Sequence, residues 1–200
     1  GHLHGTDLAE KQPTKLAAME AHWETKKGAP KYLFAIPDES NERNLVELFP
    51  IPGFLSLLAT HDVAGEVKGL KEFKKEDRPP VLISYLSFQL MVALGIYFLI
   101  IMLYAWFKRK KIENHPKFLK TVLYSIPLPY IACGLGWTLA EVGRQPWIVY
   151  GVLRTSEAAS PLDAGPVAVT LVAFVVVYAA IGAIGFGLMG RFARQGIKNI

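Results

Sequence analysis

The chain from Val81 to Phe107 reads VLISYLSFQLMVALGIYFLIIMLYAWF, and the basic cluster Lys108–Lys111 follows it directly. A helix rises about 1.5 Å per residue, so an uncharged run of this length can cross a hydrocarbon core about 30 Å thick. Two further apolar runs extend from about residue 118 to 140 and from about 166 to 190. We therefore predict an all-α integral membrane protein with three transmembrane helices at about 81–107, 118–140 and 166–190.

Prolines mark the expected interruptions of regular structure. Pro127 and Pro129 predict a kink in the second membrane helix. Residues 28–80 contain six prolines among scattered charges and no apolar run, which predicts loops and short helices only. The chain thus divides into a polar region, residues 1–80, and a membrane region, residues 81–200.

The distribution of basic residues predicts the topology. Residues 108–120 hold six Lys and Arg, the tail after Gly190 holds three, and residues 141–166 hold two. The positive-inside rule places residues 108–117 and the C-terminus in the cytoplasm, and residues 1–80 and 141–165 outside. The formal charge of +5 is therefore explained by topology and does not indicate nucleic-acid binding. The single cysteine excludes an internal disulfide framework.

A helix of about three turns is predicted between Gln12 and Glu24, where a proline follows Gln12. At helical spacing, Leu16, Met19 and Trp23 form one apolar stripe. Lys15 and Glu20 flank this stripe, so the helix offers an apolar wedge between one base and one acid. The pattern alone favours an ordinary surface helix.

Met91 lies on a stripe of the first membrane helix that also includes Ser84, Phe88 and Gly95. A thioether in this place could ligate a haem iron opposite a histidine from another helix. However, a methionine in an apolar helix usually fills a gap in the packing, and the pattern alone favours that interpretation.

Glu141 ends the second membrane helix and shares a face with Trp137 and Gly134. An ionisable group in this place is costly unless it is paired or coordinates something. It could ligate a haem iron, relay protons, or form an i,i+3 ion pair with Arg144. The spacing favours the ion pair.

Three blocks of sequence together resemble subunit I of the cytochrome bd quinol oxidases. They are GRQPW (143–147) with GVLRT (151–155), QPTKLAAME (12–20), and SFQLM (87–91). The resemblance extends over essentially the whole chain, as the C-terminal part of that subunit. It is of the type with a short quinol-binding loop, since residues 28–75 lack the long insertion of some members.

The resemblance implies a role for each matching residue. It implies that Lys15 and Glu20 bind and oxidise quinol, with Gln12 as a weaker candidate. Met91 matches the ligand of the low-spin haem b, and Glu141 matches the ligand of the high-spin haem b, which shares its site with haem d.

The resemblance also implies that Trp137 and Arg144 line the pair formed by the high-spin haem b and haem d. Gln89 stands where many members have an arginine, which puts the propionate contact of the low-spin haem in doubt. The axial histidines of the low-spin haem and of haem d belong to the upstream part of the subunit.

By resemblance, the whole enzyme lies in a bacterial or archaeal cytoplasmic membrane together with a second membrane subunit. It oxidises ubiquinol or menaquinol on the outer side and reduces oxygen to water with protons from the cytoplasm. Two rival interpretations are a transporter or channel fragment, in which Glu141 and Arg144 form a gate, and a non-catalytic assembly subunit. Neither rival predicts haem absorbance.

Overall fold

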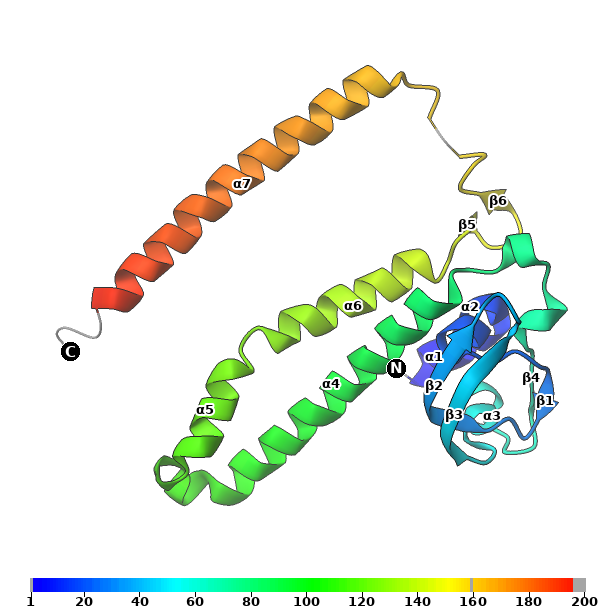
Figure 1. Ribbon diagram of the computed structural model, residues 1–200, viewed down its shortest axis with the longest axis horizontal. Helices are drawn as coiled ribbons and strands as arrows, with labels where there is room; N and C mark the ends of the chain where they lie inside the picture. The colour runs from blue at the N-terminus through cyan, green and yellow to red at the C-terminus, as the bar shows by residue number, and fades with distance from the viewer. Residues whose placement is uncertain (1, 159, 196–200) are drawn as a thin grey trace. The chain divides into compact units, whose positions relative to one another are not determined.

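The computed structural model describes residues 2–158 and 160–195, which belong to two units (Figure 1). The first unit, Gly1–Ala158, contains the polar region and two spans, and the second, Ala159–Ile200, contains one long helix. Three helical segments are long and apolar enough to cross a membrane: Lys75–Asn114, Pro116–Val142 and Ala164–Gln195. The prediction of a mostly helical membrane chain with three spans is confirmed.

The first span is built on α4, Val81–Lys108. Pro80 precedes its first residue, where a proline is well tolerated because the first turn has no helical partner for its N–H groups. The 28 residues of α4 give it a length of about 42 Å. The 3₁₀ helix η3, Arg109–Asn114, follows at the basic cluster.

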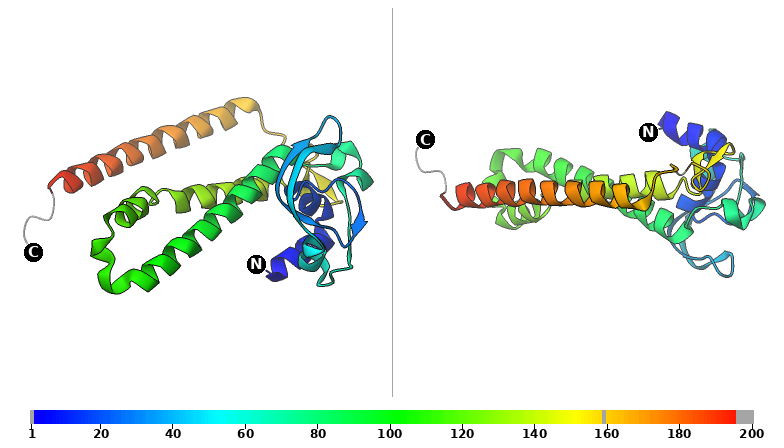
Figure 2. Two further views of the ribbon diagram at one scale, coloured as in Figure 1. Left: turned by 60° about the horizontal axis from the view of Figure 1, so that its bottom comes forward. Right: turned by 90° about the horizontal axis from the view of Figure 1, so that it is seen from above.

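The second span is broken in two, as the prolines predicted. Helix α5 covers Pro116–Tyr124 and helix α6 covers Leu128–Val142. Pro127 and Pro129 have no N–H to continue the helical hydrogen-bond ladder, so the helix is interrupted there. The α5–α6 segment returns antiparallel to α4, and α6 packs along it (Figures 1 and 2).

The polar region contains five short helical segments. They are α1 (His2–Lys11), α2 (Pro13–Met19), α3 (Phe54–Thr60), η1 (Leu70–Glu72) and η2 (Lys75–Asp77). Helix α1 was not predicted. Helix α2 is shorter than the predicted helix because the backbone turns at Ala21, whose φ of 49° is not helical.

The polar region contains a β-hairpin. The prediction that residues 28–80 form only loops and short helices is therefore wrong. Strands β2 (Lys31–Asp38) and β3 (Arg43–Ile51) pair antiparallel, with a register shift between Ile36 and Pro37. A two-stranded ribbon has two free edges and tolerates proline at an edge position or a bulge. A smaller pair joins β1 (Lys26–Lys27) to β4 (Glu66–Val67).

Helix α2 contributes to two hydrophobic clusters. Leu16 and Met19 pack in a cluster that includes Leu139 of α6. Ala17 and Ala18 pack in a second cluster, which also contains Tyr85 of α4. The predicted apolar stripe of α2 is therefore buried inside the chain and is not offered to a ligand, which corrects the sequence-based interpretation.

The second unit consists of α7, Ala164–Gln195. Its 32 residues give a length of about 48 Å. The helix carries no charged residue before Arg191, and the small residues Ala179, Ala183 and Gly187 recur at i,i+4 spacing. This spacing is typical of helix packing within a membrane.

Candidate functional site

Lys15 reaches from α2 to the end of α6. Its Nζ donates a hydrogen bond to the backbone carbonyl of Ala140 at 3.3 Å. Gly143 leaves room for this approach, since a Cβ there would lie 3.3 Å from Lys15 Cε and 2.5 Å from a backbone oxygen. Burial lowers the pKa of Lys15, and the positive charge of Arg144 lowers it further, whereas Glu141 raises it. Lys15 therefore belongs to the same electrostatic group as the Glu141–Arg144 pair.

Glu141 and Arg144 form the ion pair that the spacing favoured. Arg144 Nη2 donates to Glu141 Oε2 at 2.5 Å, which confirms that prediction. The two side chains are 48% and 40% exposed on this chain. An exposed pair of this kind contributes about 0–1 kcal/mol to stability, so stability alone does not account for it at a membrane boundary.

The two faces of α6 have different surroundings. Gly136 and Leu139 face α4 and the core, and Leu139 is 8% exposed. Trp137 is 71% exposed on this chain, and Glu141, on the same face of the helix, is also accessible. The structure thus keeps Trp137 and Glu141 together but places Met91 against the opposite face.

Met91 packs against the cluster that includes Leu139. A Cβ on Gly136 would lie 3.1 Å from Met91 Sδ, so the glycine makes room for the thioether. Phe88, one turn earlier on α4, packs against the same cluster. Met91 is half-buried.

Glu20 follows α2 and is buried, at 5% exposure. Its partner is Lys31 at the start of β2, whose Nζ lies 2.6 Å from Oε1 and 2.7 Å from Oε2. Burial raises the pKa of Glu20, and the charge and hydrogen bonds of Lys31 oppose that shift. Although Lys15 and Glu20 come from one motif, their side chains lie in different surroundings, and no described cavity is lined by both.

A small pocket lies between α2 and the chain that follows α6. Its lining consists of Gln12, Thr14, Lys15, Gly143, Arg144, Trp147, Ile148 and Tyr150. The last three belong to the small hairpin of β5, Trp147–Val149, and β6, Leu153–Arg154, or to its turn.

Three buried polar atoms in this pocket find no hydrogen-bond partner among the described residues: Gln12 Oε1, Arg144 Nε and Trp147 Nε1. Buried polar groups in folded proteins are nearly always paired, and a pocket of about 10 Å³ has room for one ordered water that could pair with these atoms. Two of the three are N–H donors, and the third is an acceptor.

Gln89 lies on α4, where the sequence departs from the pattern of the bd oxidases, and it also has a buried polar atom without a hydrogen-bond partner in the described part of the chain. Its Nε2 is buried without a partner among the described residues.

The described residues contain no group of three or more His, Cys, Asp or Glu side chains that could hold a metal ion. A haem iron needs only axial protein ligands, and a methionine and a carboxylate provide donor atoms for such sites.

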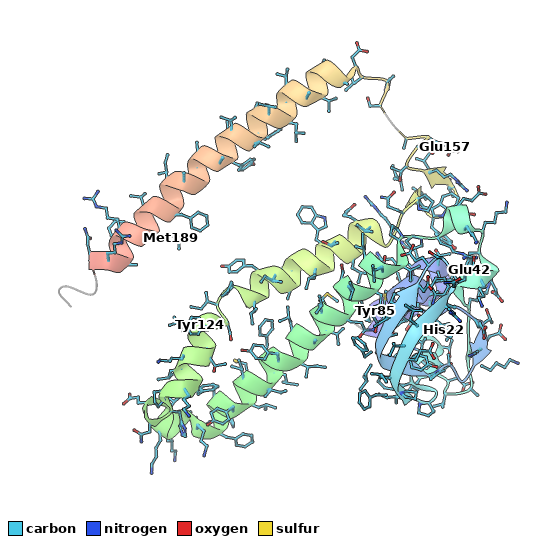
Figure 3. All side chains as sticks on the ribbon, in the orientation of Figure 1. His22, Glu42, Tyr85, Tyr124, Glu157 and Met189 are labelled. Carbon is cyan, nitrogen blue, oxygen red and sulfur yellow. The ribbon has the colours of Figure 1, made fainter. Side chains whose placement is uncertain are left out.

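Lys31, Tyr85 and Trp147 are candidate site residues that the sequence analysis did not single out. Tyr85 points from the start of α4 into the polar region, where its hydroxyl accepts a hydrogen bond from Ala35 N at 2.6 Å (Figure 3). Trp147 was visible in the GRQPW block but received no role. Lys31 carried no signal, because its partner is set by the hairpin and not by local spacing.

Comparison with known proteins places these residues in context. Residues 1–197 match the family described as cytochrome bd terminal oxidase subunit I. Cytochrome bd ubiquinol oxidase subunit 1 of Bacillus subtilis (strain 168) is 34% identical, over 100% of this chain and 45% of that protein. Cytochrome bd-II ubiquinol oxidase subunit 1 of Escherichia coli (strain K12) is 31% identical, over 98% and 51%.

A solved structure agrees with these relatives. The bd oxidase from Geobacillus thermodenitrificans has a chain that superimposes with a TM-score of 0.81 at 35% identity, over 98% of this chain and 45% of that one. The chain therefore spans about half the length of the relatives that it matches. Because the family match extends over nearly every residue, this chain belongs to the cytochrome bd terminal oxidase subunit I family.

Proposed function

We propose that this chain is the C-terminal part of the haem-bearing subunit of a quinol:oxygen oxidoreductase. The observation that carries the proposal is the family match over residues 1–197, within which all the quoted motifs are present. The relatives in Bacillus subtilis and Escherichia coli are named ubiquinol oxidase subunits, which supports quinol as the reductant. The chain spans about half of those relatives. In this proposal, the upstream part of the subunit and the second membrane subunit that the resemblance implies complete the enzyme.

Met91 and Glu141 are the iron ligands in this proposal. Met91 would hold the low-spin haem b, and Glu141 the high-spin haem b beside haem d. Trp137 and Arg144 would line the pair formed by the high-spin haem b and haem d, and both side chains are accessible on this chain. When bound, the haems carry electrons from quinol to oxygen, which is reduced to water.

Lys15 and Glu20 serve the quinol in this proposal. Glu20 is a buried carboxylate that can accept a proton as the quinol is oxidised. Lys15 supplies a charged hydrogen-bond donor near the Glu141–Arg144 pair. No cavity described above is lined by both residues, and in this proposal the upstream part of the subunit supplies the rest of the quinol site.

The proposed sidedness puts residues 1–80 and 141–165 on the outer face. The polar region lies at the end of the first unit where α4 begins and α6 ends, and the basic cluster of η3 lies at the other end (Figure 1). This arrangement supports quinol oxidation at the outer face and a cytoplasmic Lys108–Lys111 cluster. Protons released from the quinol would then leave on the outer side.

Reduced-minus-oxidised spectra of the full oxidase in membranes test the proposed function. We expect absorbance from haem b and haem d, with quinol-dependent oxygen consumption. An oxidase without haem absorbance would exclude the proposal and favour the transporter or assembly interpretation.

Lys15→Ala is expected to raise the KM for quinol about tenfold to a hundredfold, because a hydrogen bond from a charged donor contributes about 1.5–3 kcal/mol. Haem content should stay at the wild-type level, since the hydrogen bond that Lys15 donates goes to a backbone carbonyl of α6 and not to Met91 or Glu141. Lys11→Ala is the matched control, because that lysine pairs with Asp7 at the surface. An unchanged KM in Lys15→Ala would remove Lys15 from the quinol site.

A further inference from the structure

The ion pair between Glu20 and Lys31 differs from the other ion pairs of the described residues. Its side chains are 3% and 9% exposed. Each of the other pairs has at least one side chain that is more than 20% exposed. Taking two charges out of water costs free energy that their attraction offsets only with good geometry, so a buried pair is weak evidence for a stabilising role.

The geometry of the pair fixes the carboxylate of Glu20 in one orientation. A single ammonium lies within 2.7 Å of both carboxylate oxygens. Lys31 Nζ also lies 5.1 Å from the centre of the Phe88 ring on α4, within the range of a cation–π contact. One lysine therefore joins the residue after α2 to the helix that carries Met91.

The strand that carries Lys31 is itself held against α4. Ala35 N, four residues along β2, donates to the hydroxyl of Tyr85, which is 2% exposed. Lys31 pairs with Ile51 at the open end of the hairpin, so the register of β2 and β3 sets its position. The backbone of β2 thus sets the position of the Lys31 ammonium, and the Lys31 side chain is buried.

We infer that Lys31 is a positioning residue for quinol oxidation: it holds Glu20 as an oriented carboxylate against the face of α4 that carries Phe88. This inference rests on the proposed role of Glu20 as the proton acceptor. An acceptor must be ionised before the quinol arrives, and a carboxylate buried without a counterion tends to take up a proton from water instead.

The groups around Glu20 are consistent with this role. Lys31 from β2 is the cation that faces it, and Tyr85 from α4 is close enough for the charge of Glu20 to act on it. His22 turns away, since its Nε2 lies 3.3 Å from the carbonyl of Val67. Burial alone raises the pKa of Glu20, and Lys31 is the group that opposes this shift.

Lys31→Met in the full oxidase tests the inference. We expect kcat for quinol oxidation to fall about tenfold at neutral pH, because Glu20 becomes protonated and proton transfer to it is lost. The rate should recover as pH rises, which moves the acidic limb of the pH profile to higher pH, while KM changes little. Infrared spectra at neutral pH should gain a protonated carboxyl band that is missing from the Glu20→Gln, Lys31→Met double variant.

Two further variants serve as controls. Lys31→Arg keeps the charge and should keep a pH profile close to that of the wild type. Lys71→Met removes a lysine from an exposed pair with Glu24, and its profile should not move. A Lys31→Met enzyme with the wild-type profile and no new carboxyl band overturns the inference.

Two other outcomes also test the role of Lys31: failed assembly of Lys31→Met and normal quinol oxidation by Glu20→Gln. If Lys31→Met does not assemble with haem, the double variant without either charge should assemble, and its failure to do so overturns a role through Glu20. If Glu20→Gln oxidises quinol normally, the proposed function of Glu20 fails, whereas the infrared band still tests whether Lys31 keeps that group ionised.

Discussion

Met91→Ala is expected to remove the low-spin haem b signal from reduced-minus-oxidised spectra of the full oxidase. The high-spin haem b and haem d should keep their absorbance, because Glu141 lies on the face of α6 opposite to the one that Met91 contacts. An alanine methyl group cannot bind an iron, so the low-spin haem b would lose the protein ligand that Met91 is proposed to supply. Electron flow from quinol should fall with the signal.

Met91→Leu separates ligation from packing. The sulfur of Met91 occupies the space that Gly136 leaves open, so the alanine variant also creates a cavity in a partly buried cluster. Leucine fills a similar volume without a sulfur and should lose the same haem signal. Met102→Ala, at a position on α4 that is 68% exposed, is the control that should retain it. A wild-type spectrum in Met91→Leu would eliminate Met91 as the ligand.

The membrane spans could be predicted because local composition determines them. Each apolar run is long enough to cross the bilayer, and each can satisfy its backbone hydrogen bonds only as a helix. Pro127 and Pro129 act on the hydrogen-bond ladder of their own helix, so the break between α5 and α6 was predictable as well. The Glu141–Arg144 pair was predictable for the same reason, since i,i+3 spacing on a helix brings the two side chains together.

The hairpin of β2 and β3 could not be predicted in this way. Pro37 and Pro50 lie within its strands and would break a central strand, but the register shift at Pro37 and the free edges of a ribbon accommodate them. Exposed apolar residues such as Phe34 and Phe49 also obscured the alternation expected of a strand with one buried face.

The surroundings of Glu20 depend on that hairpin, so only half of the candidate site could be predicted from the sequence. The motif that contains Lys15 and Glu20 pointed to both residues but implied a shared surface. The turn at Ala21 and the strand beyond it bring Lys31 to Glu20 instead, and Lys15 is left to face α6. A contact between elements that a turn connects has no periodic signature in the sequence.

Glu20→Gln is expected to lower kcat for quinol oxidation by about 10²–10⁴-fold, which is the usual contribution of a positioned proton acceptor. The amide cannot accept the proton, but its oxygen can still accept a hydrogen bond from Lys31, so the buried ammonium keeps a partner. Glu20→Ala is the harsher test, because it leaves Lys31 buried without a counterion and costs about 3–5 kcal/mol of stability.

The half-reactions show where the defect of Glu20→Gln lies. Haem absorbance and the reoxidation of chemically reduced haems by oxygen should match the wild type, because the carboxylate of Glu20 bonds to Lys31 and not to Met91 or Glu141. Glu24→Gln is the matched control, since that carboxylate lies four residues away in exposed pairs with Lys26 and Lys71. Slow reoxidation in Glu20→Gln would place the defect at the oxygen-reducing side, and normal quinol turnover would remove Glu20 from proton transfer. Slow quinol oxidation with fast reoxidation, by contrast, assigns Glu20 to the step at which the quinol loses its protons.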